Sequence, residues 1–317
     1  MTSSFQRVQI LVSIFKQHKI KHVVFSPGSR NAPLVIGFKN DSFFQTKVVI
    51  DERSAGFIAL GMAQQLNQPV ALCSTSGSAT LNYSPSICEA FYQRIPLIVL
   101  TADRPPEWID QGEGQSINQN AIYKNYIEAS FQFPVDENKD TLWHAERLTN
   151  EAINLAYLKN KPVHINIPFR EPLYKTTSLS IKGKKVELTS YERSLNNTKL
   201  VELSNKWNSY DKKMIICGLL RKDEHLNKTL NILSEDPSII ILTETTSNLN
   251  NPAFIPCIDR TLERIKDNKD FIPEIIITIG GAIISKKLKT LFRQNYPNDH
   301  WHIDKEDSAM DVFSSLT

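Results

Sequence analysis

Short runs of apolar and β-branched residues alternate with stretches of helical spacing along the first half of the chain. We expect strands at KHVVF, KVVI, PVALCS, IPLIVLT and VHINIP, which span 21–25, 47–50, 69–74, 95–101 and 163–168. The intervening stretches predict helices near 4–18, 31–38, 53–65, 80–93 and 140–158. Strands separated by helices in this way favour a parallel sheet covered by helices on both faces. The predicted fold class is therefore α/β.

Small and polar residues follow four consecutive strands of this predicted sheet. The segments are SPGSRN after the first strand, DER after the second, STSGSAT after the third and ADRPPEWIDQGEGQ after the fourth. In parallel sheets, ligands collect at the carboxyl ends of the strands. The sequence therefore predicts that the four segments meet at one edge and form the candidate site.

The apolar pattern breaks between 176 and 196, where Lys, Ser and Thr become frequent, and it resumes afterwards. This interruption indicates a linker. Beyond it we expect strands at 214–218, 239–243, 274–280 and 300–304. We therefore predict two consecutive domains, 1–175 and 197–317, each a mainly parallel sheet with helices on both faces.

Composition and charge exclude several classes of protein. The 37 basic and 34 acidic residues are interspersed, and a net charge of +3 is too small to argue for a nucleic-acid partner. The four cysteines lie far apart without a CxxC pair, which favours buried, reduced thiols in a cytoplasmic protein over a disulfide or zinc framework. No apolar run approaches the roughly 20 residues of a membrane span, so we expect a soluble protein.

Glu52 stands where a predicted buried strand meets a helix of small residues. One interpretation is structural: Asp51 caps the helix, and Glu52 stabilises its positive end. The other is functional. Small residues recur at four-residue spacing along this helix, at Ala55, Ala59 and Ala63. They would let another element, such as a second copy of the chain, pack closely and bury Glu52. A buried carboxyl has a raised pKa and can share a proton with a ligand nitrogen.

Two strand-to-helix turns carry small residues. SPGSRN offers a tight turn at Pro27 and Gly28. Ser29 and Arg30 then start a helix, which suits a carboxylate or phosphate but equally fits an ordinary helix start with a surface arginine. TSGSAT, at 75–80, is either a ligand loop or a close-packed turn. It is no Walker loop, because no Gly-Lys pair follows.

Arg104 lies in TADRPPEW between Asp103 and two prolines. The prolines stiffen the backbone and would hold the guanidinium in one direction. The alternative is a plain surface pair between Asp103 and Arg104, which stabilises little. The Gly-rich loop that follows carries Gln115 and Gln119 and is either a substrate gate or simply a loop.

Other features have simpler explanations. His300 and His302 share one face of a predicted strand, but no third metal ligand accompanies them. Gly280 and Gly281 follow a strand without a GxGxxG pattern, so packing explains them better than a nucleotide.

Taken together, the segments resemble a known family. Glu52 and the small residues of its helix are similar to the pyrimidine-domain signature of thiamine-diphosphate enzymes, and TSGSATLN resembles a turn of the acetolactate-synthase superfamily. More narrowly, SPGSRNAPL, DERSAGFIALGMA, TSGSATLNYSPSICEA and LTADRPPEWIDQGEGQSINQ resemble the 2-succinyl-5-enolpyruvyl-6-hydroxy-3-cyclohexene-1-carboxylate synthases of menaquinone biosynthesis. This detailed resemblance covers roughly residues 20–125, and the order of domains covers the rest.

The resemblance implies a transferase that uses thiamine diphosphate with Mg²⁺ or Mn²⁺. Such an enzyme decarboxylates 2-oxoglutarate and adds the succinyl carbanion to isochorismate. The first domain would be the pyrimidine-binding domain, through which the chain forms a homodimer or homotetramer. Glu52 would be catalytic, because it hydrogen-bonds the cofactor's aminopyrimidine and favours its imino tautomer. The other matched positions are cofactor-binding Pro27, Thr75 and Gly77 and substrate-binding Ser29, Arg30, Arg104 and Gln115.

One departure concerns the metal. The family holds the diphosphate and the metal on a third domain through a Gly-Asp-Gly-type motif, and none of the 11 glycines here is followed by Asp. We therefore expect the pyrimidine-binding and central domains only, no metal ligand, and no activity from this chain alone. Two alternatives stay open. One is another 2-oxo acid decarboxylase or acetolactate-synthase-like enzyme, which LTADRPPE argues against. The other is a non-catalytic binding or assembly module that holds a nucleotide on the central sheet.

Overall fold

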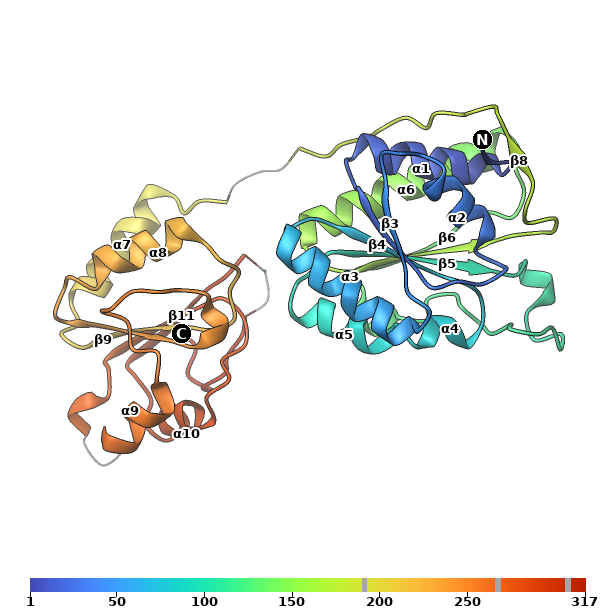
Figure 1. Cartoon of the computed structure of the whole chain (residues 1–317). Helices are drawn as coiled ribbons and strands as arrows, with labels where there is room; N and C mark the ends of the chain where they lie inside the picture. The colour runs from blue at the N-terminus through green and yellow to red at the C-terminus, as the bar shows by residue number, and fades with distance from the viewer. Residues whose placement is uncertain (190–192, 266–268, 306–308) are drawn as a thin grey trace. The chain divides into compact units, whose positions relative to one another are not determined.

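The structure is a computed structural model that describes residues 1–189, 193–265, 269–305 and 309–317. The chain divides into two compact units, Met1–Tyr191 and Glu192–Thr317 (Figure 1). Each unit contains a parallel sheet with helices on both faces, so the predicted α/β class is confirmed.

The sheet of the first unit has six parallel strands. They are β2 (His22–Phe25), β3 (Gln45–Val48), β4 (Val70–Ser74), β5 (Leu97–Asp103), β6 (Ala129–Gln132) and β7 (Val163–Pro168). Their order is β3-β2-β4-β5-β7-β6. Five of these strands were predicted. The sequence did not indicate β6, because Phe131 is its only buried residue and the apolar pattern is correspondingly short.

Two sets of helices cover this sheet (Figure 1). One face carries α1 (Gln6–Gln17), α2 (Ala32–Lys39) and α6 (Lys139–Lys159), and the other carries α3 (Glu52–Leu66), α4 (Ser78–Leu81) and α5 (Ser84–Tyr92). Alternate strand residues enter the two cores: Val23 and Phe25 face the first set, and Val24 faces the second. The helix predicted at 80–93 is instead two helices, α4 and α5, and Pro85 lies in the first turn of α5. Two 3-10 turns, η1 (Pro106–Trp108) and η2 (Lys124–Tyr126), follow β5.

The segment predicted to begin the linker lies instead on the first unit. β8 (Thr176–Thr177) pairs antiparallel with β1 (Thr2–Ser3). The backbone N–H of Ile181 donates to Gln9 Oε1 (2.9 Å), and that of Val186 donates to Asn150 Oδ1 (2.7 Å). Polar side chains on α1 and α6 therefore hold this segment in place, and apolar periodicity does not reveal such contacts. The first unit accordingly continues beyond 175, where the sequence predicted its end.

The second unit is a four-stranded parallel sheet. Its strands are β9 (Lys213–Cys217), β10 (Ile239–Thr243), β11 (Ile275–Ile279) and β12 (Asp299–Ile303), in the order β10-β9-β11-β12. One face carries α7 (Asn197–Asn208) and α8 (Glu224–Leu233), and the other carries α9 (Ile258–Ile265) and α10 (Lys286–Gln294). Two 3-10 turns are η3 (Thr245–Ser247) and η4 (Lys269–Phe271). All four strands agree with the apolar runs that predicted them.

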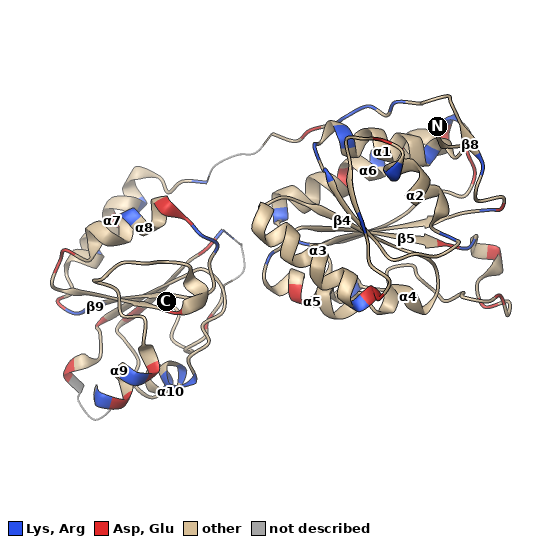
Figure 2. Ribbon diagram, in the orientation of Figure 1, with Lys and Arg blue, Asp and Glu red and all other residues tan. Residues whose placement is uncertain are grey.

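In the view of Figure 2, charged residues of both signs are interspersed along the described parts of both units. Among the described residues, no helix is long and apolar enough to cross a bilayer. All four cysteines are free thiols. Cys73 and Cys217 are buried as predicted and Cys88 is half-buried, whereas Cys257 is exposed just before α9, so the prediction of burial is wrong there.

Candidate functional site

The four candidate segments leave the first sheet at one edge. β3, β2, β4 and β5 are adjacent and parallel, so their carboxyl ends share that edge, called here the carboxyl edge. Phe25 of β2 lies opposite Cys73 of β4, and Ser74 of β4 lies opposite Thr101 of β5. The chain therefore leaves neighbouring strands at the same level, and the gathering predicted from the sequence is present.

The first two turns pack directly against each other. A Cβ atom at Gly28 would lie 2.3 Å from Thr75 Cβ, far inside contact distance. Two residues later, the backbone N–H of Arg30 donates to Thr75 Oγ1 (3.3 Å). Glycine is therefore required at 28 for the turn after Pro27 to reach the turn that begins at Thr75.

The Gly-rich loop after β5 crosses the second turn at Gly77. This glycine has a φ of +85°, and a Cβ there would lie 3.0 Å from the backbone of Gln115. Its N–H donates to Gln119 Oε1 (2.8 Å). Left-handed backbone and close approach both favour glycine at this position. Gln115, itself exposed at a φ of +53°, is thereby placed over the turn that contains Thr75 and Gly77.

Arg30 lies beneath this edge with only 7% of its surface exposed. Its guanidinium donates to the Phe169 carbonyl (3.1 Å) and pairs with Glu171 (3.4 Å). Burial lowers the pKa of Arg30, and the positive charge of Arg104 lowers it further. Ser29, the preceding residue, is exposed. The guanidinium of Arg30 is therefore fixed in direction while its neighbouring hydroxyl is open to solvent.

Arg104 holds the Gly-rich loop. Its Nε and Nη2 donate to the Gly114 carbonyl (3.0 and 2.6 Å), and its Nη1 pairs with Glu113 (3.3 Å). The positive charge of Arg104 contributes to the lowered pKa of Arg30, so the two guanidinium groups lie within electrostatic range of each other. An anion bound between them would relieve their repulsion.

Glu52 begins α3 and is half-buried. The preceding residue caps the helix, because Asp51 accepts a hydrogen bond from Ser54 N (2.7 Å). The prediction of a buried strand before it is wrong: β3 is the outermost strand of the sheet, and Val48 and Ile50 are exposed. Within this chain, Glu52 therefore faces solvent on one side.

Tyr83 bonds to the residue that precedes the first turn. Its hydroxyl donates to the Cys73 carbonyl (2.9 Å) and shares a hydrogen bond with Ser26 (2.9 Å), the residue before Pro27. Burial raises the pKa of Tyr83 well above its ordinary value, and the negative charge of Glu52 adds to the rise. Glu52 starts α3 just after the carboxyl end of β3, so it lies at the same edge as the two turns.

The small-residue face of α3 packs within this chain. Ala55, Ala59 and Ala63 are fully buried. A Cβ at Gly56 would lie 2.1 Å from Ser86 Oγ on α5, so the two helices touch at that glycine. The close packing predicted from the alanine spacing is present, but α5 and the sheet occupy that face rather than a second copy of the chain.

Two sequence families match the chain over most of its length. Residues 6–122 match "Thiamine pyrophosphate enzyme, N-terminal TPP binding domain", and residues 182–315 match "Middle domain of thiamine pyrophosphate". The chain belongs to the thiamine pyrophosphate enzymes. Their cofactor is also called thiamine diphosphate.

Curated relatives agree on a narrower name, 2-succinyl-5-enolpyruvyl-6-hydroxy-3-cyclohexene-1-carboxylate synthase. The relative from Flavobacterium psychrophilum is 43% identical over 98% of this chain and 56% of its own length. Those from Porphyromonas gingivalis and Bacteroides thetaiotaomicron are 38% and 36% identical, over 98% and 100% of this chain and 54% and 58% of their own lengths. The resemblance drawn from the motifs is confirmed. The chain spans little more than half the length of these relatives.

Solved structures of thiamine-diphosphate enzymes share the fold. Benzoylformate decarboxylase from Polynucleobacter necessarius matches with a TM-score of 0.68 and 16% identity, over 88% of this chain and 51% of that one. The 4-hydroxybenzoylformate decarboxylase from Rhodococcus jostii RHA1 gives the same score and identity, over 87% and 52%. At this identity the likeness concerns the fold alone.

Several residues of this candidate site were missed from the sequence. Glu113, inside the Gly-rich loop, and Glu171, after β7, are the partners of the two arginines, and the sequence did not indicate either pairing. Asn166 and His164 did carry a signal, because VHINIP places two polar residues on one face of a strand that is otherwise apolar. A buried polar side chain needs a partner, so such a pair predicts a hydrogen-bond network.

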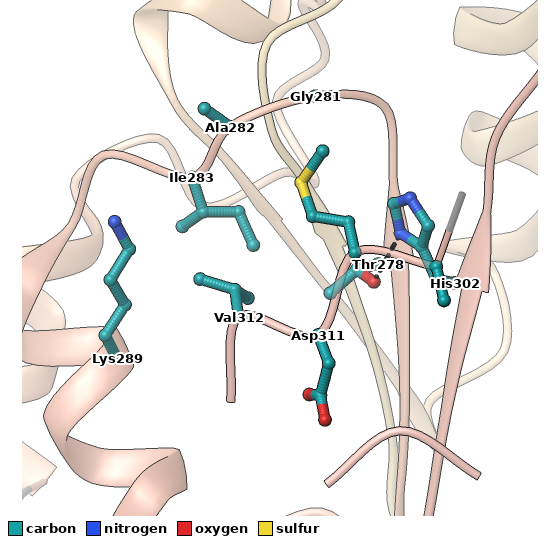
Figure 3. A pocket seen from close by; sticks show the side chains of 10 residues that line it. Thr278, Gly281, Ala282, Ile283, Lys289, His302, Asp311 and Val312 are labelled. Atoms are coloured by element: carbon teal, nitrogen blue, oxygen red, sulfur yellow. Dashed lines mark hydrogen bonds between the residues drawn. The ribbon is translucent and has the colours of Figure 1, made fainter. Parts of the chain in front are cut away.

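The second unit contains a separate pocket of about 360 Å³ (Figure 3). His302 hydrogen-bonds Thr278 (2.9 Å, dashed in Figure 3), and the other lining residues are Gly281, Ala282, Ile283, Lys289, Ala309, Met310, Asp311 and Val312. None of the site residues predicted from the sequence lines it. Within the described ranges, no group of three His, Cys, Asp or Glu side chains could hold a metal ion, and His300 and His302 remain a pair.

The start of α10 is already satisfied by the chain itself. Glu244, just after β10, accepts hydrogen bonds from Ile284 N (2.8 Å) and Ser285 N (2.7 Å). A helix start of this kind is where a phosphate would bind. Because a carboxylate of the chain takes that place, the geometry argues against a nucleotide at this end of the second sheet.

His164 generates a prediction about acid stability. It is fully buried in β7, and burial lowers its pKa to about 3. The unfolded imidazole, with a pKa of about 6.5, binds a proton at a higher pH than the folded one. Between these pH values the unfolded state binds more protons. The free energy of unfolding should therefore fall by up to about 1.4 kcal/mol per pH unit as pH decreases.

Urea unfolding of the wild-type chain and His164→Gln, between about pH 7 and pH 5, measures this contribution. We expect the variant to lose less stability over that range. His225→Gln, at an exposed position of α8, is the control and should keep the wild-type slope. Equal slopes for wild type and His164→Gln would contradict the prediction.

Proposed function

We propose that this chain contributes the pyrimidine and substrate side of the active site of a synthase that transfers a succinyl group from 2-oxoglutarate to isochorismate. The observation that carries the proposal is the pair of guanidinium groups, Arg30 and Arg104, at the edge that also holds Glu52. When bound, thiamine diphosphate would supply the nucleophilic carbon for decarboxylation. The free thiols suit the reducing cytoplasm.

The carboxyl edge fits the pyrimidine end of that cofactor. Glu52 is half-buried at the helix start, so a ligand could reach it, and it would hydrogen-bond a ring nitrogen. Pro27, Thr75 and Gly77 would line the ring. Glycine at 28 and 77 allows close contact with Thr75 and Gln115, which holds the two turns together at this edge. The diphosphate and Mg²⁺ or Mn²⁺ would be held by residues outside these 317, so we propose no synthase activity for this chain alone.

The arginines suit substrates with more than one carboxylate. Each is paired with a glutamate, but the Glu171 and Glu113 side chains are 73% and 40% exposed, and exposed ion pairs contribute little. A substrate carboxylate could therefore replace either glutamate. Ser29 and Gln115 are exposed beside them and would add hydrogen bonds. A decarboxylase for a 2-oxo acid with a single carboxylate would have less use for two cations.

Kinetic tests need a chain of the relatives' full length. One such protein, called here the fused synthase, joins residues 1–317 to the part of the Flavobacterium psychrophilum relative that lies beyond its matched region. Succinyl transfer by the fused synthase, measured with 2-oxoglutarate and isochorismate, tests the proposal. Conversion of other 2-oxo acids without use of isochorismate would favour the decarboxylase alternative.

Glu52→Gln in the fused synthase should lower kcat by about 10²–10⁴-fold, because an amide cannot share a proton with the pyrimidine as a carboxyl does. The control is Asp51→Asn, one residue away, which affects the helix cap rather than the proposed proton site. That variant should keep its turnover. Steady-state kinetics at saturating cofactor measure both, and near-normal turnover in Glu52→Gln would refute the assigned role.

Arg104→Ala should weaken use of isochorismate more than binding of the cofactor. Loss of a desolvated charge pair costs about 2–5 kcal/mol, which should appear in kcat/KM for isochorismate. Arg147→Ala, on the exposed surface of α6, removes the same charge and is the control. If affinity for thiamine diphosphate fell while isochorismate kinetics held, Arg104 would have been assigned to the wrong ligand.

We also propose that the chain self-associates through its first unit. The alanine face of α3 is buried, so the contact would use its outer face, where Phe57 and Ile58 are exposed beside Ile50, and Gly61 has open space around it. Exposed apolar side chains gathered in this way favour an interface. Sedimentation velocity should show a dimer or larger, and Phe57→Glu should dissociate it. Leu179→Glu, at an exposed apolar residue away from α3, should not dissociate it. A monomeric wild type would disprove the proposal.

A further inference from the structure

A buried network of polar side chains lies beneath the carboxyl edge, and Gln119 is its link to the Gly-rich loop. Although the loop before it is exposed, Gln119 is only 1% exposed. Its Oε1 accepts from Gly77 N (2.8 Å), and its Nε2 donates to the Ala102 carbonyl (3.1 Å) and to Asn166 Oδ1 (2.9 Å). If the amide were flipped, its nitrogen would face the Gly77 N–H and its oxygen would face the oxygens of Ala102 and Asn166. The side chain therefore has one orientation.

Asn166 is equally saturated. Its Oδ1 accepts from Gln119 and from Thr101 Oγ1 (2.7 Å), and its Nδ2 donates to Asp103 Oδ2 (2.7 Å) and Gln132 Oε1 (2.9 Å). Both donor hydrogens and both acceptor positions of this amide are used. Three strands, β5, β6 and β7, are thereby joined at one buried side chain.

The hydrogen bonds of this network run in one direction. The hydroxyl of Thr101 donates its single proton to Asn166, so it accepts from His164 Nε2 (2.7 Å). The neutral His164 ring then accepts at Nδ1 from Ser130 (3.1 Å). The chain ends on the Asp103 carboxylate, whose charge polarises every donor before it.

Asp103 also bonds to the backbone of Arg104, so the network extends to that residue. Its Oδ1 accepts from the backbone N–H of Arg104 (2.8 Å), while Oδ2 accepts from Asn166. Burial raises the pKa of Asp103, and these hydrogen bonds together with the charges of Arg30 and Arg104 oppose the rise. One continuous set of buried contacts thus connects the N–H of Gly77 with the backbone from which the Arg104 side chain extends.

We propose that Gln119 is a positioning residue, which keeps the turn at Gly77, the overlying Gln115 and the guanidinium of Arg104 in one fixed arrangement. The assignment of cofactor to the turn and of substrate to the arginine rests on the proposed function, whereas the coupling does not. Gln115 lies four residues before Gln119, and its backbone lies so close to Gly77 that a Cβ added there would be only 3.0 Å away. Fixing Gln119 therefore also fixes where Gln115 lies.

The coupling is tested first on the 317-residue chain. Gln119→Met keeps the side-chain volume and removes the amide, so the Gly77 N–H loses its acceptor. Hydrogen exchange of that amide, followed by NMR, should become about tenfold faster or more. Asn150→Leu is the matched control, because it removes a buried amide that bonds to Lys184 and Val186, at the segment beyond β8. It should leave Gly77 unchanged. Unchanged exchange at Gly77 in Gln119→Met would overturn the coupling, whatever the protein binds.

The positioning role is tested in the fused synthase. Well below the melting temperature, Gln119→Met should lower kcat/KM for isochorismate about 10- to 100-fold, and Asn150→Leu should change it by less than about twofold. Gln119→Glu adds a measurement, the pH dependence of activity, that would stay unchanged if Gln119 served only for packing. The introduced carboxylate would face the oxygens of Ala102 and Asn166 without a hydrogen to donate. When it is protonated, the carboxyl can donate to one of them. The ratio of variant to wild-type activity should therefore rise as pH falls.

A pH-independent ratio for Gln119→Glu, together with full activity in Gln119→Met, would overturn the positioning role and leave Gln119 as a packing residue. Absence of succinyl transfer by the wild-type fused synthase would instead overturn the proposed function. In that case the exchange of the Gly77 amide still decides whether Gln119 couples the turn to Asp103.

Discussion

The contact between Gly28 and Thr75 is the constraint on which the candidate site depends. β2 and β4 are neighbours with Phe25 opposite Cys73, so the turns after them leave the sheet at the same level. They can do so only because residue 28 has no side chain, since a Cβ there would overlap Thr75. Arg30 follows two residues later and bonds to Thr75 through its backbone. The backbone position of Arg30 is thus determined by strand register and by the absent side chain at residue 28, and the Phe169 carbonyl and Glu171 then orient its guanidinium.

The two units share a fold but differ in how their strand ends are satisfied. In the second unit, Glu244 already bonds to the start of α10, so that positive end is neutralised by the chain. In the first unit, the guanidinium groups of Arg30 and Arg104 pair with the exposed Glu171 and Glu113, which solvent competes for, while the buried carboxylate of Asp103 bonds to Asn166 and to the backbone of Arg104. Positive charge is therefore left available at one edge and not at the other, which explains why ligand chemistry is expected in the first unit.

Much of the fold could be predicted because buried parallel strands are continuous apolar runs. β7 and β10 begin and end at the predicted residues, 163–168 and 239–243. In the first sheet, the predictions fail at the two outermost strands. β3 is one outermost strand, so the prediction of a buried strand at KVVI is wrong. β6 is the other, and it has one buried residue. The order of strands, which decides both cases, is a property of long-range packing and leaves no local pattern.

The candidate site, too, could be predicted only where its residues depend on local properties of the chain. The need for glycine at 28 and the stiffness of the prolines beside Arg104 are local properties, and the sequence reveals them. The partners of Gln119 are not local, because β7 brings Asn166 beside β5 only through the strand order. What the sequence does show is that an apolar strand contains His164 and Asn166 on one face, and buried polar groups require partners. The exposed Ser29 and Gln115 belong to recognisable motifs, whereas the buried side chains that hold their loops lie in strands without any motif. Motifs therefore identify the groups that face a ligand, and polar residues inside buried strands identify the groups that determine where those ligand-facing residues lie.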